Sequence, residues 1–447
     1  MKIGAFDKVI GILGNPTNPD VAWSDSQLTA IRDIGVDTIQ LSIAWSWKPA
    51  NEVLNMEDLD DPHVHALYKE RIKKAHAHGL SALAHFGIPY TDNFLKPACI
   101  MNPTVLSKYQ TRLEKFFSES DADEIMIYNY DQSAWLCSEF DDCPNCKGVP
   151  LHTRLGPFLD ALASTVQSVK PGGMFWWEPW ELSEGQMISV IENITADNFG
   201  IIMHSNIAEV NFNNMIDLPS RNIARLAKTR GMPFISEGFF GGSGEDIEGL
   251  THMPCPRLVY QQLESMKRTY GLTGIKEYYG FVPADFSVNT AMFRMYLQSP
   301  DMRFDDMLTA IAKAYGEKGA LKEAWEMAAQ GLEIFPYNAS WWLRFILSKP
   351  ETQSWTRIKE ADWETPAWKT NRRGYYMVTS EQEQHPWLYE DVSLRAMAAA
   401  QRFKKAVKFL DQANVRPEMK IDIAMQKRDI TKIMEAAYAF AHSIGNY

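Results

Sequence analysis

The sequence has no long apolar run, few cysteines and no cluster of basic residues. No stretch reaches the ~18 apolar residues that a membrane-spanning helix needs, and the amino terminus lacks the apolar core of a signal peptide. We therefore expect a cytoplasmic protein that makes no membrane contact. Only 5 cysteines occur in 447 residues, so a disulfide framework is not expected. The net charge of −11 and the lack of a basic stripe exclude a nucleic-acid partner.

Short apolar runs bounded by Gly, Pro, Asn or Asp recur through the first 280 residues, and we count eight of them. They span residues 9–13, 38–43, 81–86, 124–128, 174–177, 200–203, 233–235 and 274–276. Stretches of helical periodicity separate them, and several end at a glycine such as Gly35, Gly79 or Gly231, which suits a helix C-cap. Eight strand–helix units predict an α/β fold, a closed (β/α)₈ TIM barrel. An open doubly wound sheet would show fewer units and a Gly-rich phosphate loop after the first strand.

The two parts of the chain differ in their patterns. We assign residues 1–300 to a catalytic barrel and residues 301–447 to a mainly helical C-terminal region packed on it. Helical periodicity covers residues 304–315, 320–335, 389–414 and 429–444. Residues 348–385 are rich in Pro, Trp and Tyr, and we expect an ordered loop segment there.

Polar and aromatic residues follow the expected strands where each one ends. Active sites of TIM barrels lie at the C-terminal ends of the strands, so these residues should meet at one mouth. In chain order they are Asn15, Trp45, Trp47, His85, Asn129, Asp131, Trp177, Glu178, Trp180, His204, Asn206, Glu237, Glu277, Tyr278 and Tyr279. Acids follow strands four, five, seven and eight. Like charges crowded into one pocket cost free energy, and a function usually justifies that cost.

This set of side chains fits glycoside hydrolysis, in which one carboxylic acid protonates the leaving oxygen and a second carboxylate attacks or activates water. We assign Glu237 as the nucleophile and Glu178 as the acid/base in a retaining mechanism, with Asp131 as the rival nucleophile. The indole and phenol rings would stack on sugar rings, while Asn, His and Glu277 would bind hydroxyl groups. The expected partner is a carbohydrate, and catalysis needs no cofactor. The oligomeric state stays open.

The arrangement resembles retaining barrel glycosidases. The clan that includes β-galactosidases and cellulases carries its nucleophile Glu at the end of strand seven, as Ser236-Glu237 does here. That clan has Asn-Glu after strand four, where this sequence has Asn129-Tyr130-Asp131 and so departs from the pattern. The α-amylase superfamily places an Asp on strand four and a Glu on strand five. Asp131 and Glu178 match that scheme, although the other signatures of the superfamily are absent.

A second resemblance covers about forty residues. The stretch from Cys143 to Pro150, followed by Arg154, is similar to a segment after strand four in hexosaminidase-like and α-glucuronidase-like barrel proteins. In those proteins, too, an Asn-x-Asp sequence precedes the cysteines. This resemblance implies a carbohydrate-active barrel.

Three cysteines have the spacing C-x₅-C-x₂-C, whose C-x₂-C element suits a structural zinc site. They are Cys137, Cys143 and Cys146, of which the last two can occupy adjacent corners of a tetrahedron. The fourth ligand would come from Cys99, Cys255, a His or an acid. The resemblance adds a precedent, because some barrel-type β-galactosidases hold a structural zinc in a cysteine cluster. The alternative is a set of reduced thiols in a long loop.

Two other functions remain open. A metal-dependent barrel isomerase or aldolase would use His85, His204, Glu178 and Glu237 as ligands. A non-catalytic sugar-binding barrel would use the acids only as hydrogen-bond acceptors.

Overall fold

The computed structural model describes residues 5–14, 23–41, 56–87, 99–128, 137, 139–140, 142–179, 182–205, 215–242, 250–283, 287–317, 319–335 and 386–444. Eight parallel strands form a closed barrel in sequence order, which confirms the predicted fold class. The strands are β1 (Lys8–Ile12), β2 (Thr38–Gln40), β3 (Ser81–Gly87), β4 (Glu124–Tyr128), β5 (Met174–Glu178), β6 (Phe199–His204), β7 (Phe234–Gly238) and β8 (Leu272–Glu277). The barrel closes where Val9 of β1 pairs with Ile275 of β8.

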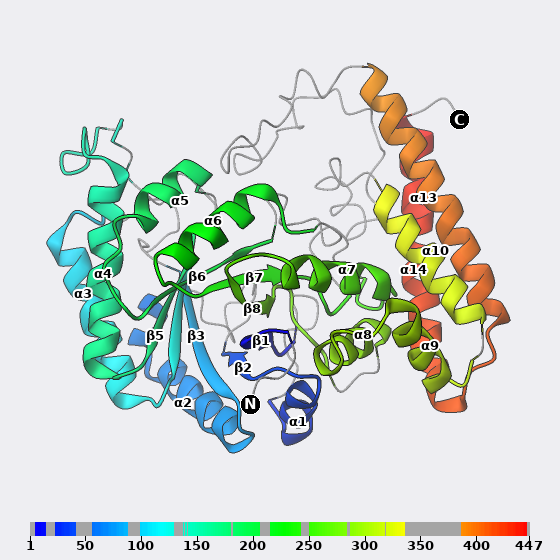
Figure 1. The fold of residues 1–447 in the computed structure, drawn as a ribbon, viewed down its shortest axis with the longest axis horizontal. Coiled ribbons are helices and arrows are strands. Elements are labelled where there is room, and N and C mark those ends of the chain that lie inside the picture. Colours follow the sequence, from blue (N-terminus) through cyan, green and yellow to red (C-terminus); the bar gives the residue numbers. More distant parts are fainter. Residues whose placement is uncertain are drawn as a thin grey trace.

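Helices surround the barrel (Figure 1). They are α1 (Asp25–Asp33), η1 (Met56–Asp60), α2 (Pro62–Ala77), α3 (Pro103–Glu119), α4 (Leu151–Val169), α5 (Glu184–Ile191), α6 (Leu218–Thr229), α7 (Pro256–Lys267) and α8 (Val288–Gln298). Side chains at their N-caps fix where several of them begin, as Asp61 does by accepting from the His63 N–H. At Gly79 and Gly231 the backbone has φ values of +73° and +75°, so a glycine there allows the chain to leave a helix and enter the next strand.

Three long helices stand together beside the barrel, namely α10 (Ala320–Ile334), α13 (Pro386–Gln412) and α14 (Lys420–Ile444) (Figure 1). Helix α9 (Phe304–Ala314) precedes them, and the short helix η6 (Pro417–Met419) joins α13 to α14. The helical C-terminal region is thus confirmed, although α14 begins earlier than the sequence pattern indicated. Arg257 of α7 contacts Glu326 and Glu333 of α10, which ties this layer to the barrel.

The boundary at residue 300 stays a prediction, and residues 348–385 lie outside the described residues. Among the helices that the structure describes, none has the length and apolar character needed to cross a bilayer.

Candidate functional site

The barrel interior contains an apolar layer that is separate from the main core. Its members are Ile10, Leu83, Met126, Trp176, Ile202 and Ile235. Side chains of a strand alternate between its two faces, so the residue two positions further along each strand also points inward. On β3, β5, β6 and β7 those residues are His85, Glu178, His204 and Glu237. The interior layer next to the C-terminal strand ends is therefore polar, whereas the layer below it is apolar.

Glu178 and Glu237 meet in this polar layer. Their side chains are buried, and a carboxylate oxygen of Glu178, one of Glu237 and a ring nitrogen of His204 all lie within 4.8 Å of one another. His204 Nε2 is 3.4 Å from Glu237 Oε2, and His85 Nε2 is 3.5 Å from Glu178 Oε2. Each carboxyl group thus has an imidazole beside it and the other carboxyl group across from it.

A buried lysine completes the layer. Lys276 is paired in register with Glu237 across β7 and β8, and its Nζ lies 2.5 Å from Glu237 Oε1. Lys276 is not among the residues predicted from the sequence, because those residues stand at strand ends and Lys276 lies inside a strand. The sequence nevertheless contains a signal for it. A lysine inside a strand of a parallel barrel is flanked by buried surface, and charged residues are seldom buried without a partner.

Burial and neighbouring charge control the protonation of the two acids. Burial, reinforced by the negative charge of Glu178, raises the pKa of Glu237 to about 8, although Lys276 opposes this shift. Near neutral pH the two carboxyl groups therefore hold one proton between them. Lys276 and Glu178 act on Glu237 in opposite directions: the hydrogen bond from Lys276 favours the ionised form, whereas the negative charge of Glu178 favours the protonated form.

His85 is neutral in this environment. Burial, and then the positive charge of Lys276, lower the pKa of His85 to about 3. Gln40 of β2 lies on the other side of the ring, with its Nε2 3.3 Å from His85 Nδ1. With the amide donating to Nδ1, the ring proton resides on Nε2 and faces Glu178. Tyr128 packs edge-on against His85 with ring centroids 5.6 Å apart. Neither Gln40 nor Tyr128 was predicted as a site residue.

Two sequence predictions are corrected by strand register. Trp177 follows the inward Trp176, so it faces the helices and packs in the main core near Phe199, where no sugar can stack on it. Glu277 follows the inward Lys276 and also points away from the barrel interior. Its carboxylate accepts hydrogen bonds from four backbone N–H groups, those of Phe240, Gly241, Tyr279 and Gly280, and so it anchors the connections after β7 and β8 rather than binding substrate.

Two further tyrosines were predicted as substrate contacts. Tyr278 packs edge-on against His204, with ring centroids 4.2 Å apart, and Lys276 Nζ lies 5.9 Å from the Tyr278 ring centroid. Tyr279 packs near Phe239. Tyr278 thus borders the polar layer, and the substrate contacts of both tyrosines stay predictions. Seven predicted residues lie outside the described residues, namely Asn15, Trp45, Trp47, Asn129, Asp131, Trp180 and Asn206.

Two groups of side chains among the described residues could hold a metal ion. One is Glu178, His204 and Glu237 in the polar layer. The other contains the three predicted cysteines, Cys137, Cys143 and Cys146, and adds Cys99.

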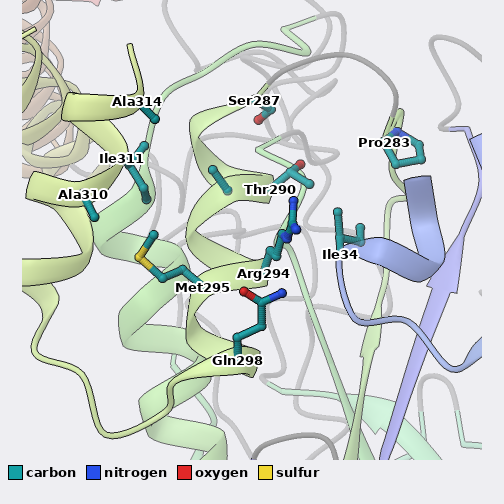
Figure 2. Close-up of a pocket in the computed structure, with 11 residues that line it drawn as sticks. Ile34, Pro283, Ser287, Thr290, Arg294, Met295, Gln298, Ala310, Ile311 and Ala314 are labelled. Carbon is teal, nitrogen blue, oxygen red and sulfur yellow. The ribbon is translucent and has the colours of Figure 1, made fainter. Parts of the chain in front are cut away.

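A cavity of about 360 Å³ lies elsewhere, among the outer helices (Figure 2). Residues of α8 and α9 line most of it, and Ile34 and Pro283 close one side. Arg294 is its only ionisable lining residue among those described, so this cavity lacks the paired acids and bases of the polar layer.

No protein-family model matches the chain, and no curated protein matches it in sequence. Among solved structures, it is similar to a glycoside hydrolase family 138 enzyme targeting pectin rhamnogalacturonan II, with 10% identity and a TM-score of 0.59. That match covers 99% of this chain and 72% of the other. An O-GlcNAc hydrolase mutant of Thermobaculum terrenum aligns with 13% identity and a TM-score of 0.48, covering 97% of this chain and 94% of the other. At 10% identity, the similarity to the first enzyme shows a shared fold.

Proposed function

We propose that the protein is a glycoside hydrolase with a retaining, two-carboxylate mechanism. One observation carries the proposal: Glu178 and Glu237 come from different strands and meet, buried, at the C-terminal end of the barrel. The similarity in fold to a glycoside hydrolase that acts on pectin supports the same class of substrate, a carbohydrate.

Each acid has a distinct role in this mechanism. In the reactive form the shared proton resides on Glu178, and Glu237, whose anion the hydrogen bond from Lys276 stabilises, attacks the anomeric carbon. Glu178 donates its proton to the leaving oxygen. A water molecule then hydrolyses the glycosyl-enzyme, with Glu178 acting as base. Retaining enzymes place their carboxyl groups about 5–5.5 Å apart, whereas inverting enzymes need about 6.5–9.5 Å to admit a water molecule. Oxygen atoms of Glu178 and Glu237 within 4.8 Å favour retention.

The neighbouring side chains would hold the acids in place. His85 and His204 each present Nε2 to one carboxyl group, and Gln40 fixes the orientation of His85. Because His85 is neutral, it can donate to Glu178 without adding a positive charge that would oppose proton transfer.

The test is a screen of aryl glycosides that cover many sugars and both anomers, with NMR detection of the first anomer released. We expect one sugar class to be cleaved with retention, and Glu237→Gln to abolish cleavage. In Glu237→Ala, added azide should fill the space left by the carboxylate and yield a glycosyl azide of inverted configuration. Turnover by Glu237→Ala within a few-fold of the wild type would overturn the assignment. If Asp131→Asn were inactive and Glu237→Gln active, the rival nucleophile would be correct.

A second function, a metal-dependent isomerase or aldolase, is favoured by one observation, the close grouping of Glu178, His204 and Glu237. The position of Lys276 disfavours a metal site, because its ammonium group already forms an ion pair with one carboxylate oxygen of Glu237. Metal analysis separates the two functions. A metal ion that is present in the wild type, absent from Glu237→Gln and required for activity would establish the metal enzyme.

A further inference from the structure

Four cysteine side chains gather beside the barrel, away from the two acids. The Sγ atoms of Cys99, Cys137, Cys143 and Cys146 all lie within 4.8 Å of one another. Cys99 precedes α3, whereas the other three lie between β4 and α4. The cluster therefore joins two βα connections that are far apart in sequence.

The sulfur spacing fits a metal ion and does not fit disulfides. Cys99 Sγ lies 3.7 Å from Cys143 Sγ and 3.5 Å from Cys146 Sγ, and all the cysteines are free. A disulfide would bring two sulfur atoms to about 2.05 Å. Four thiolates around a tetrahedral zinc ion at about 2.3 Å have sulfur atoms about 3.8 Å apart. The observed distances are close to that value.

The backbone around Cys143 and Cys146 forms a tight turn. The N–H groups of Cys146 and Lys147 both donate to the Cys143 carbonyl, at 3.2 and 2.9 Å. Gly148 follows with φ +71°, a conformation that side chains other than hydrogen disfavour. This turn places the two thiols on the same side of the chain, as a zinc knuckle requires.

Hydrogen-bond donors surround the sulfur atoms. Backbone N–H groups of Asn145 and Cys146 point at Cys143 Sγ, and the side-chain amide of Asn145 lies 3.7 Å from Cys99 Sγ. Donors in this position stabilise the negative charge that thiolates bring to a metal. Beside neutral thiols the same donors would form only weak hydrogen bonds.

Both connections are anchored to helices. Arg154, buried at the start of α4, donates to the Cys137 carbonyl and, at 2.8 Å, to the Val149 carbonyl. The Asn102 N–H donates to the Cys99 carbonyl at 2.9 Å, at the N-cap of α3. These hydrogen bonds anchor Cys99 to α3 and Cys137 to α4.

We propose that Cys99, Cys137, Cys143 and Cys146 bind one structural zinc ion. Four protein ligands fill the tetrahedron, so no position remains for a substrate or a reactive water. The ion ties the β3–α3 connection to the β4–α4 connection, which follow the strands that carry His85 and Tyr128. This proposal goes beyond the glycosidase and does not depend on it.

The test begins with protein purified without a metal-affinity tag. We expect one zinc ion per chain by elemental analysis and a shell of four sulfur atoms at about 2.3 Å by X-ray absorption. Dialysis against a mild chelator should strip zinc from Cys99→Ser and leave the wild type loaded. Cys255→Ser is the matched control, because Cys255 is buried at the start of α7, outside the cluster, and that variant should keep its zinc.

The zinc content and the X-ray absorption spectrum of the wild type test the proposal even if Cys99→Ser folds poorly. Iron in place of zinc, a shell with fewer than four sulfur atoms, a disulfide within the cluster by mass spectrometry, or metal-free protein with four reactive thiols would each overturn the proposal.

Discussion

Lys276 donates to Glu237 across the β7–β8 pair, with Nζ 2.5 Å from Oε1 and both side chains fully buried. A carboxylate oxygen of Glu178 lies within 4.8 Å of one of Glu237. The Lys276 ammonium group thus places a positive charge in direct contact with Glu237. In the proposed mechanism, that contact makes Glu237 the nucleophile and leaves Glu178 as the proton donor.

Replacing Lys276 should change the pH dependence of activity. An opposite charge at this distance typically lowers a carboxyl pKa by ~1–3 units, so Lys276→Met should raise the pKa of Glu237 by that amount. Since the nucleophile must be ionised, the acid limb of the kcat/KM profile should move to higher pH. Lys8→Met is the control: Lys8 pairs with Glu124 at the opposite end of the barrel, and its loss should leave the profile in place. An unmoved acid limb in Lys276→Met would contradict the proposed role.

Glu178→Gln should lower activity in a way that depends on the leaving group. General acid catalysis contributes about 10²–10⁴-fold, so kcat/KM should fall by that factor for an alkyl glycoside, whose departing oxygen needs a proton. In an aryl glycoside with an acidic phenol, the phenolate departs without protonation. The fall in kcat/KM for that substrate should therefore be much smaller. Glu124→Gln serves as the control, because that acid is buried below the apolar layer, where it bonds Trp176 Nε1 at 2.5 Å. Equal losses for both substrates would exclude Glu178 as the acid.

The raised pKa of Glu237 also predicts how stability varies with pH. The buried pair of Glu237 and Glu178 keeps one shared proton up to about pH 8, whereas a free glutamate loses its proton near 4.5, so the folded state binds more protons between those values. The free energy of unfolding of the wild type should therefore fall as pH rises from about 4.5 to about 8. The shift of about 3.5 units sets an upper limit of about 5 kcal/mol, at about 1.36 kcal/mol per unit.

Glu237→Gln cannot titrate, so its free energy of unfolding should fall less over the same interval. In this variant Lys276 has lost its carboxylate partner, and a buried unpaired lysine favours the neutral form. Its titration would make the free energy of unfolding rise with pH, which would reduce the fall further. Urea unfolding of both proteins at several pH values measures the difference. If the free energy of unfolding changed with pH equally in both proteins, folding would not raise the pKa of Glu237, and the prediction would be wrong.

The barrel could be predicted because each strand is a short apolar run between turn residues, and eight such runs allow few other folds. The two acids were found for the same reason: Glu178 and Glu237 each stand at the end of a run. Inward and outward positions could not be assigned in this way, since a strand buried on both faces shows no alternation in hydrophobicity. The pairing of β7 with β8 places Lys276 inside the barrel and Glu277 outside it. This pairing cannot be read from the order of the residues alone.

The cysteine cluster shows a similar limit. Cys143 and Cys146 are recognisable from their spacing, but Cys99 belongs to another connection, and only the fold brings it to the others. Sequence spacing identifies ligands that share a turn, whereas ligands from separate elements depend on tertiary structure.

Glu277→Gln should destabilise the protein without a direct effect on chemistry. Both carboxylate oxygens of Glu277 accept from backbone N–H groups, two each. An amide would turn its NH₂ group toward two of these donors and leave them unsatisfied. Hydrogen bonds to a charged group are worth about 1.5–3 kcal/mol, so we expect a loss of that order in the free energy of unfolding. The folded fraction should keep its pH profile, and Glu326→Gln on α10 provides a less buried comparison.

Two helical glycines should respond in opposite directions to alanine. A Cβ at Gly331 of α10 would lie 2.4 Å from Phe403 Cε1, a ring buried where α10 crosses α13, so Gly331→Ala should cost about 1–3 kcal/mol of unfolding free energy. At Gly185 of α5 the nearest atom, Ser183 Oγ, is 4.0 Å away. Gly185→Ala should therefore stabilise the protein by about 0.5–1 kcal/mol, because alanine loses less backbone entropy in a helix. Urea unfolding of both variants measures these changes. If Gly331→Ala were as stable as Gly185→Ala, helices α10 and α13 would not pack as closely as the structure places them.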